Sequence, residues 1–231
     1  MQAGAGCFSI PFDVPPYRLS GAVYGALLNH RSALAALGDA ASRPPYNAPP
    51  AAPVLYIKPR NTLAPTGSVV RIPAGIPELE VGACLGLVVG RTACRVTESR
   101  ALDYVAGYLI VADVSIPHSG YHRPSIRFKA RDGYCPLGPA VIARAAVANP
   151  DALTIRTHLD GALVQTASTA DLIRPAARLL ADVTDFMTLA PGDVLSLGAA
   201  APAPRVRSGQ TVRIEIDGFG SLSNPFMDAA A

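Results

Sequence analysis

Tryptophan is absent from the 231 residues, and charged side chains make up only 16% of them. The net charge at pH 7 is +3, and the Lys and Arg residues are scattered without forming a run. Because nucleic-acid-binding surfaces need clustered cations, such a partner is not indicated. Apolar runs such as Leu85–Gly90 are far too short to cross a bilayer, so no membrane span is expected either.

Paired cysteines are also missing, since Cys7, Cys84, Cys94 and Cys135 include no Cys-x-x-Cys pair. The segment before Cys7 has neither a basic stretch nor an apolar core, so a secretion signal is not indicated. A chain of this length can be stabilised by its hydrophobic core alone, and we expect reduced thiols and a cytoplasmic protein. Cys84 lies in an apolar run and is expected to be a small buried side chain rather than a nucleophile.

The common nucleotide-binding and hydrolase motifs are absent as well. No Gly-x-Gly-x-x-Gly follows an expected strand, and there is no Walker loop and no Gly-x-Ser-x-Gly. His118 and His122 have the spacing of a helical metal pair, but Pro117 and Gly120 favour a loop, and no third ligand is evident. The two histidines therefore do not predict a metal site by themselves.

What the chain does contain is apolar surface and turn residues. Half of the residues are hydrophobic, with 22 Pro and 20 Gly, a balance that favours short strands and turns over a helix bundle. Residues 1–17 are small and Pro-rich and are expected to form a loose extension, followed by a single domain over residues 18–231. The composition predicts a β-rich α+β fold with a few helices.

Apolar runs bounded by turn residues predict a series of strands. They cover Ala22–Leu28, Val54–Ile57, Ser68–Ile72, Cys84–Val89, Tyr108–Val111, Leu153–Leu159 and Val212–Ile216. Asp160-Gly161 directly follows one alternating run and predicts a hairpin there. Residues 43–53 contain five prolines and are expected to form a loop.

Two helices are expected. Arg31–Leu37 is a short one that Gly38 could end. The longer one has its apolar residues at helical spacing: Leu172, Ala176, Leu179, Leu180, Val183 and Phe186. Ser168 or Thr169 could cap it, but Pro175 lies inside the pattern and either kinks the helix or shifts its start. Its apolar face is expected to cover one sheet.

Cationic side chains recur in segments rich in Pro and Gly. They are Lys58, Arg60, Arg123, Lys129 and Arg131. A solvated surface position is the ordinary explanation for each of them. Together they could instead form a cationic pocket for a substrate with several carboxylates, because loops often carry function and guanidinium and ammonium groups bind carboxylates well.

Several segments together carry a family resemblance. They are Leu28–Ser32, Pro45–Pro50, Ile57–Thr62, Asp103–Tyr108, Ala112–Ser115, Tyr121–Pro124, Lys129–Pro139, Thr169–Leu172, Pro191–Asp193 and Asn224-Pro225. Over roughly residues 20–226 the chain resembles fumarylacetoacetate hydrolase-like proteins. Within them it resembles the N-terminal half of the bifunctional decarboxylase/isomerases of 4-hydroxyphenylacetate degradation, whose two related halves form one chain in some bacteria and separate subunits in others. The resemblance implies a β-sandwich roll with outer helices, usually in dimers or larger assemblies.

The resemblance also implies a chemistry. Active members hold Mg²⁺ or Mn²⁺ with three carboxylates, and the ion polarises a bound 2-oxo acid. A nearby lysine adds positive charge where the enolate develops. By this resemblance Asp113 is the third carboxylate and Lys129 is the lysine, and these two are the expected catalytic residues. The expected substrate-binding residues are Lys58, Arg60, Asn61, Arg123 and Arg131.

The sequence departs from the family at the metal site. The two Glu of the family's Glu-x-Glu fall on Gly82 and Cys84, its histidine falls on Ala33, and its Thr-Gly-Thr-Pro corresponds to Leu197–Ala200. One carboxylate does not hold a hard dication well, so no metal or other cofactor is expected for this chain. Glu78-Leu79-Glu80 offers another Glu-x-Glu, but it lies about 13 Å earlier on a strand that rises ~3.3 Å per residue.

Three functions remain open. The first is a subunit that depends on a homologous sister subunit with an intact metal site. With it, the chain would decarboxylate 5-oxopent-3-ene-1,2,5-tricarboxylate and isomerise 2-hydroxyhepta-2,4-diene-1,7-dioate. The second is a metal-independent isomerase or decarboxylase that acts alone, with Lys129 as electrophile and Asp113 as base. The third is a dicarboxylate-binding protein without chemistry. Asp113 also has a structural interpretation, as a buried acceptor paired with Lys129.

Overall fold

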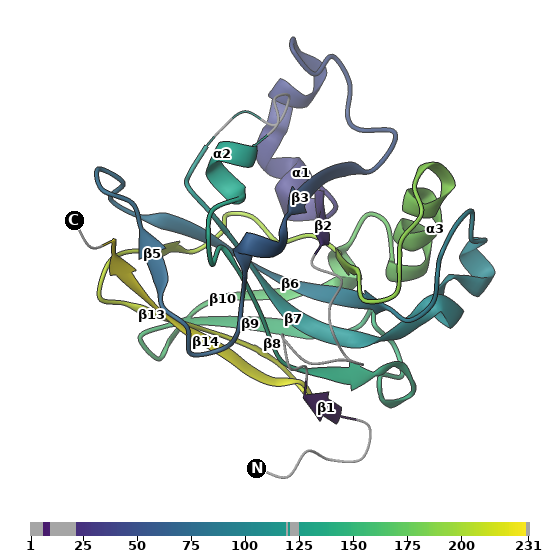
Figure 1. The fold of residues 1–231 in the computed structure, drawn as a ribbon. Helices are drawn as coiled ribbons and strands as arrows, with labels where there is room; N and C mark the ends of the chain where they lie inside the picture. Colours follow the sequence, from purple (N-terminus) through teal and green to yellow (C-terminus); the bar gives the residue numbers. More distant parts are fainter. Residues whose placement is uncertain (1–6, 10–21, 119, 121–124, 230–231) are drawn as a thin grey trace.

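The computed structural model describes residues 7–9, 22–118, 120 and 125–229, and its strands form two sheets (Figure 1). The larger sheet contains β1 (Cys7–Ser9), β2 (Val23–Leu27), β3 (Val54–Lys58), β4 (Leu63–Ala64), β6 (Leu79–Val89), β7 (Val105–Ser115), β8 (Cys135–Ala143), β11 (Val194–Ser196) and β12 (Arg205–Val206). The smaller sheet contains β5 (Val70–Ile72), β9 (Thr154–Leu159), β10 (Ala162–Ser168), β13 (Thr211–Ile216) and β14 (Gly220–Asp228).

The helices lie outside the sheets. They are α1 (Arg31–Leu37), α2 (Ile126–Lys129) and α3 (Ala176–Phe186), with the 3₁₀ turns η1 (Gly38–Ser42), η2 (Arg60–Thr62), η3 (Glu98–Tyr104), η4 (Arg144–Ala146) and η5 (Thr169–Asp171). At the top of Figure 1, α1, α2 and β3 gather at one end of the roll, and α3 packs against η3 at the right. No helix in the described part of the chain is long and apolar enough to span a membrane.

The larger sheet curls until its two ends meet. Its order is β1-β8-β7-β6-β11-β2-β3, with β12 beside β6. After β3 the chain passes through η2 into β4, which pairs in parallel with the start of β8, Leu63 opposite Cys135. β4, which follows the last strand β3 in the chain, therefore pairs with β8 near the opposite end of the sheet. The β-sandwich roll with few outer helices confirms the expected fold class.

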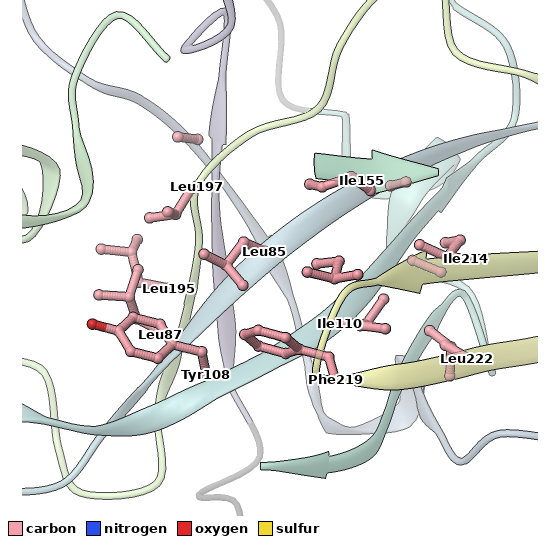
Figure 2. Packing of buried hydrophobic residues seen from close by; sticks show 14 of the residues in the cluster. Leu85, Leu87, Tyr108, Ile110, Ile155, Leu195, Leu197, Ile214, Phe219 and Leu222 are labelled. Carbon is pink, nitrogen blue, oxygen red and sulfur yellow. The ribbon is translucent and has the colours of Figure 1, made fainter. Parts of the chain in front are cut away.

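Side-chain alternation on β6 and β7 divides the apolar residues into two cores. One lies between the two sheets and is called the inter-sheet core; Figure 2 shows Leu85 and Ile110 of the larger sheet near Ile214 and Leu222 of the smaller one. The other lies inside the curl of the larger sheet and is called the inner core. Its buried members are Val23, Cys84, Val88, Leu109, Val111, Cys135, Leu137, Val141 and Val194.

All seven expected strands are present, with different bounds. The largest extension is in β6, which begins at Leu79, and in β7, which continues to Ser115. Two long strands, β8 and β14, were not expected, because Pro136 and Pro139 in one and Pro225 in the other argue against a strand. The pairing of β8 with β7 is irregular between Tyr108 and Ile110, close to Pro139 in the register.

The hairpin and the two longer helices agree with the predictions made from the sequence. β9 and β10 pair across Asp160-Gly161, both of which have positive φ. Arg31–Leu37 forms α1, and Gly38, with φ of 50°, ends it. The long helix begins at Ala176, directly after Pro175, so the shifted start is the correct interpretation. Ser168 caps the separate turn η5, where its hydroxyl accepts a hydrogen bond from the backbone N–H of Ala170.

Of the expected N-terminal extension, the structure describes residues 7–9, which pair with β8 as β1. The loop expected over residues 43–53 contains no strand and ends where β3 begins at Val54.

Candidate active site

A cavity of about 270 Å³ opens at one end of the curl. Its polar lining residues are Glu80, Asp113, Ser115, His118, Lys129 and Arg205. Small apolar residues complete the wall, among them Ala33 and Ala36 of α1 and the segment 199–203. Two of the six polar residues, Asp113 and Lys129, are the expected catalytic pair.

Strand alternation explains why these polar side chains converge. In the antiparallel pair β6–β7, Gly82 lies opposite Asp113 and Glu80 lies opposite Ser115. Residues two apart on a strand share a face, so all four lie on the face that carries Cys84 of the inner core. The inner face is thus apolar in the middle of the curl and becomes polar where the cavity opens.

Two buried ammonium groups hold the Asp113 carboxylate. Lys129 Nζ donates to Oδ2 at 2.5 Å, and Lys58 Nζ lies 3.0 Å from Oδ1. Burial raises the pKa of Asp113, but the two positive charges outweigh burial and lower it to about 2. Both carboxylate oxygens are therefore occupied and ionised, a geometry that does not favour Asp113 as a proton acceptor.

Lys58 is fully buried behind Asp113. Its Nζ donates to the backbone carbonyls of Val114, Lys129 and Tyr134 at 2.5, 2.9 and 2.8 Å. Three carbonyls use all three N–H groups of an ammonium, so the contact with Asp113 is an ion pair. Burial lowers the pKa of Lys58, and the charge of Asp113 opposes that shift. The sequence places Lys58 among the substrate-binding residues, but its side chain does not line the cavity.

Lys129, in contrast, is presented to the cavity. Its Nζ donates to Asp113 and lies 4.4 Å from the centre of the Tyr56 ring, a cation–π contact. These contacts leave one N–H without a partner among the described residues, and the side chain lines the cavity. Two ammonium groups and one carboxylate also leave one positive charge in excess. Lys129 is therefore placed to stabilise a negative oxygen on a bound molecule.

Tyr56 fits beneath this cluster because residue 25 is glycine. A Cβ on Gly25 would lie 2.0 Å from Cζ of the Tyr56 ring, which no real structure tolerates. Burial, together with the negative charge of Asp113, raises the pKa of Tyr56 well above its ordinary value. The hydroxyl therefore stays protonated, and the ring serves as a neutral support for the Lys129 ammonium.

Glu78 and Glu80, the other Glu-x-Glu, are held by arginines at the cavity rim. β12 pairs with β6 and places Arg205 opposite Glu80. Arg205 Nη2 lies 2.8 Å from Glu80 Oε1, and its Nη1 lies 3.2 Å from Glu78 Oε1. Arg207 Nε lies 3.4 Å from Glu78 Oε2. Of the two glutamates, only Glu80 lines the cavity.

Of the other expected substrate-binding residues, the described ones, Arg60, Asn61 and Arg131, do not line this cavity. Arg60 is exposed in η2, and Asn61 Nδ2 donates to Asp132 Oδ1 at 2.7 Å. Arg131 lines a separate cavity of about 310 Å³. Arg123 lies outside the described residues. A role for these residues in substrate binding stays a prediction.

The comparisons with known proteins identify the family. Residues 22–227 match the model of the fumarylacetoacetate (FAA) hydrolase C-terminal region. The chain belongs to the fumarylacetoacetate hydrolase family. It is 42% identical over 210 residues to the 4-hydroxyphenylacetate degradation bifunctional isomerase/decarboxylase of Escherichia coli. The aligned region covers 91% of this chain and 48% of that protein. The chain thus spans about half the length of this bifunctional relative.

More distant similarities include a tautomerase and two isomerases of known structure. The mitochondrial oxaloacetate tautomerase fahd2 of Xenopus laevis is 32% identical over 186 residues, 76% of this chain and 58% of that protein. The crystal structure of 5-carboxymethyl-2-hydroxymuconate delta-isomerase from Mycobacterium smegmatis superimposes with a TM-score of 0.79 at 27% identity, covering 92% of this chain and 81% of that one. The crystal structure of 2-hydroxyhepta-2,4-diene-1,7-dioate isomerase from Mycobacterium marinum superimposes with a TM-score of 0.78 at 28% identity. The match covers 92% of this chain and 77% of that one.

The family is typically metal-dependent. The resemblance puts its ligand positions on Gly82, Cys84 and Asp113, and these three residues do not fit Mg²⁺ or Mn²⁺. Gly82 has no side chain, and a Cβ there would lie 2.8 Å from Cβ of Ala199. Cys84 is buried, and burial raises the pKa of its thiol to about 12, so it stays neutral. The third carboxylate, Asp113, already binds two ammonium groups. Within the described ranges no cluster of three His, Cys, Asp or Glu side chains could hold a metal.

Sequence reasoning missed Arg205 and Tyr56. Arg205 is 127 residues from Glu78 in the sequence, and only the pairing of β12 with β6 brings them together. No local pattern announces that pairing, because β12 has two residues. Tyr56 had one usable signal, since it alternates with Lys58 on β3 and so shares its buried face.

Proposed function

We propose that this chain is one of two homologous halves of an isomerase/decarboxylase in 4-hydroxyphenylacetate (homoprotocatechuate) catabolism. It depends on a sister subunit that carries the intact metal site. Together they decarboxylate 5-oxopent-3-ene-1,2,5-tricarboxylate and isomerise 2-hydroxyhepta-2,4-diene-1,7-dioate. The observation that carries the proposal is the 42% identity over 91% of this chain with half of the E. coli bifunctional isomerase/decarboxylase.

The site supports a division of labour between the two halves. A divalent ion in the sister subunit supplies Lewis-acid chemistry to a bound 2-oxo acid. In this chain, Lys129 supplies an N–H and an excess positive charge at the cavity wall. Keto–enol isomerisation needs such a stabiliser for the developing enolate oxygen, together with a proton acceptor. Isomerisation is therefore the half-reaction assigned to this chain.

The test separates the two halves before it mixes them. Isomerase and decarboxylase activities are measured on the purified chain alone, on the sister subunit alone and on the mixture, each with and without chelator. We expect decarboxylation to need the sister subunit and its metal. The proposal is supported if activity appears only in the mixture. It is also supported if Lys129→Met in this chain abolishes isomerisation but leaves decarboxylation intact.

A second candidate has its own supporting observation. The uncommitted N–H of Lys129 and the net positive charge of its cluster need no metal, which suits an isomerase that acts alone. Full isomerase activity of the purified chain in chelator would favour this candidate over dependence on a sister subunit. Dicarboxylate binding without turnover in every setting would instead favour a binding protein.

A further inference from the structure

The cavity needs a proton acceptor if it isomerises anything, and its described lining offers two carboxylates, Glu80 and Asp113. Asp113 is committed to two ammonium groups, one on each oxygen. His118 also lines the cavity, but its ring stacks on Phe128 at 4.8 Å and its Nδ1 lies 2.9 Å from the carbonyl oxygen of Ile116. Glu80 is the carboxylate that is left.

We propose that Glu80 is the general base of this cavity, that it moves a carbon-bound proton of an unsaturated 2-oxo dicarboxylate, and that Arg205 is its positioning residue. The proposal rests on the isomerase function proposed above. It goes beyond that function by assigning the proton transfer to a residue outside the family's carboxylate positions.

The contacts of Glu80 suit this role. Its Oε1 binds Arg205 Nη2 at 2.8 Å, which fixes the carboxylate, while Oε2 has no partner among the described residues. About a quarter of the side chain is exposed. Arg205 is held in turn by Glu78, so the guanidinium is anchored on both sides. One oxygen of Glu80 is thus fixed, and the other is left to accept a proton.

The absence of a side chain at residue 82 gives the substrate its place. Glu80 and Gly82 lie on the same face of β6, about 7 Å apart along the strand, and Gly82 lies opposite Asp113. No β6 side chain therefore stands between Glu80 and the Asp113–Lys129 pair. Because Glu80, Gly82 and Lys129 all line the cavity, a substrate beside Gly82 can place its carbonyl oxygen against Lys129 and the carbon that loses its proton against Glu80.

The proton and electrons balance without a further reactant. The C–H bond breaks and its proton goes to Glu80 Oε2. The electron pair forms a new C=C bond, the existing C=C bond shifts by one position toward the former carbonyl carbon, and the carbonyl oxygen becomes an enolate held by the N–H of Lys129. The enolate then takes a proton from water to give the dienol, and Glu80 returns its proton to water. The reverse reaction follows the same steps.

The experiment compares two glutamates that bind the same arginine. Glu80→Gln and the control Glu78→Gln each remove one carboxylate from Arg205, but only Glu80 lines the cavity. Isomerisation of 2-hydroxyhepta-2,4-diene-1,7-dioate is followed by absorbance in the assembly of this chain with its sister subunit. We expect kcat to fall about 100-fold or more for Glu80→Gln, the range of general-base catalysis, with KM within about threefold. Glu78→Gln should lower kcat much less, because its amide oxygen can still accept a hydrogen bond from Arg205.

Chemical rescue gives a readout that a structural role would not move. Added formate should restore part of the rate of Glu80→Ala, because a small carboxylate can enter the space left by the side chain. Equal rates for Glu80→Gln and Glu78→Gln would overturn the assignment while leaving the isomerase function in place. So would a larger loss in His118→Gln than in Glu80→Gln. A wild-type assembly that does not isomerise the dienol at all would overturn the proposed function, and the role of Glu80 with it.

Discussion

Lys58 Nζ lies 3.0 Å from Asp113 Oδ1, and the two side chains are only 1% and 8% exposed. The ion pair spans the curl of the larger sheet, since Lys58 is on β3 and Asp113 is on β7. Lys129 binds the other oxygen of the same carboxylate. The cluster of Asp113 with its two lysines is thus a structural junction that joins β3 to β7.

Asp113→Asn should destabilise the fold by about 3–5 kcal/mol, because it leaves two buried ammonium groups without a counter-charge. Asp182→Asn is the matched control. Asp182 also binds two cations, Arg174 at 3.0 Å and Arg178 at 2.7 Å, but Arg178 is half exposed. Solvent screening should limit that loss to about 1 kcal/mol or less. Urea unfolding of both variants measures the difference, and equal losses would contradict the importance of burial here.

Gly82 should tolerate no side chain unless Ala199 is replaced by glycine. Gly82→Ala places a Cβ 2.8 Å from that of Ala199, and we expect a loss of about 1–3 kcal/mol from overpacking. Adding Ala199→Gly should recover most of it. Gly86→Ala is the control, since its Cβ would meet Val111 at 2.7 Å instead. A double-mutant cycle from thermal or urea unfolding gives the coupling, and an equal rescue of both glycine variants by Ala199→Gly would refute it.

Stability should fall in mild acid because of His30. Its Nδ1 accepts a hydrogen bond from the backbone N–H of Ser32 and lies 2.8 Å from Ser32 Oγ, which accepts from the N–H of Ala201. Burial lowers the pKa of His30 below 6.5, and the charge of Asp171 opposes this shift. The unfolded chain therefore binds the proton first. The stability that neutral His30 contributes is complete above the ordinary histidine pKa. It is lost as the pH falls through the lowered pKa of the folded protein.

The measurement for His30 is the urea midpoint at about pH 7.5 and about pH 5, on either side of an ordinary histidine titration. His30→Asn keeps a capping acceptor at the start of α1 but does not titrate. Its midpoint should change less with pH than that of the wild-type chain. An identical pH dependence in both proteins would show that His30 is not responsible.

Calorimetric titration of the chelator-stripped chain with Mg²⁺ and Mn²⁺ should show no binding up to about millimolar ion, because hard dications need several oxygen ligands and these carboxylates are already paired. Micromolar one-to-one binding would contradict this expectation. Glu78→Gln, Glu80→Gln and Asp113→Asn would then show which carboxylates form the site.

Local patterns predicted most of the elements, while long-range pairing decided the site. The apolar runs located the strands, and Pro175 was correctly weighed as a possible start of the long helix. Asp113 and Lys129 were paired by resemblance, and the structure places them in contact. A Pro-rich neighbourhood suggests a surface position for Lys58, but the closure of β4 onto β8 buries it. That closure depends on contacts between distant residues, which no single segment reveals.

The prolines explain the missed strands in similar terms. Pro136 removes a backbone donor from β8, but it lies in the two-residue pairing with β4 rather than in the regular ladder with β7. A proline is tolerated where the neighbouring strand does not need its N–H. The sequence alone does not state which neighbour a residue faces, so β8 could not be distinguished from a loop.

The division into two cores bears on how such a protein changes over evolutionary time. The inter-sheet core contains many large buried side chains and includes none of the residues proposed for chemistry. Gly82 and Cys84, which by the resemblance stand where the family has metal ligands, both lie on the inner face of β6. A lineage can therefore exchange one reaction mechanism for another on that face while the sandwich that keeps the protein folded is inherited unchanged.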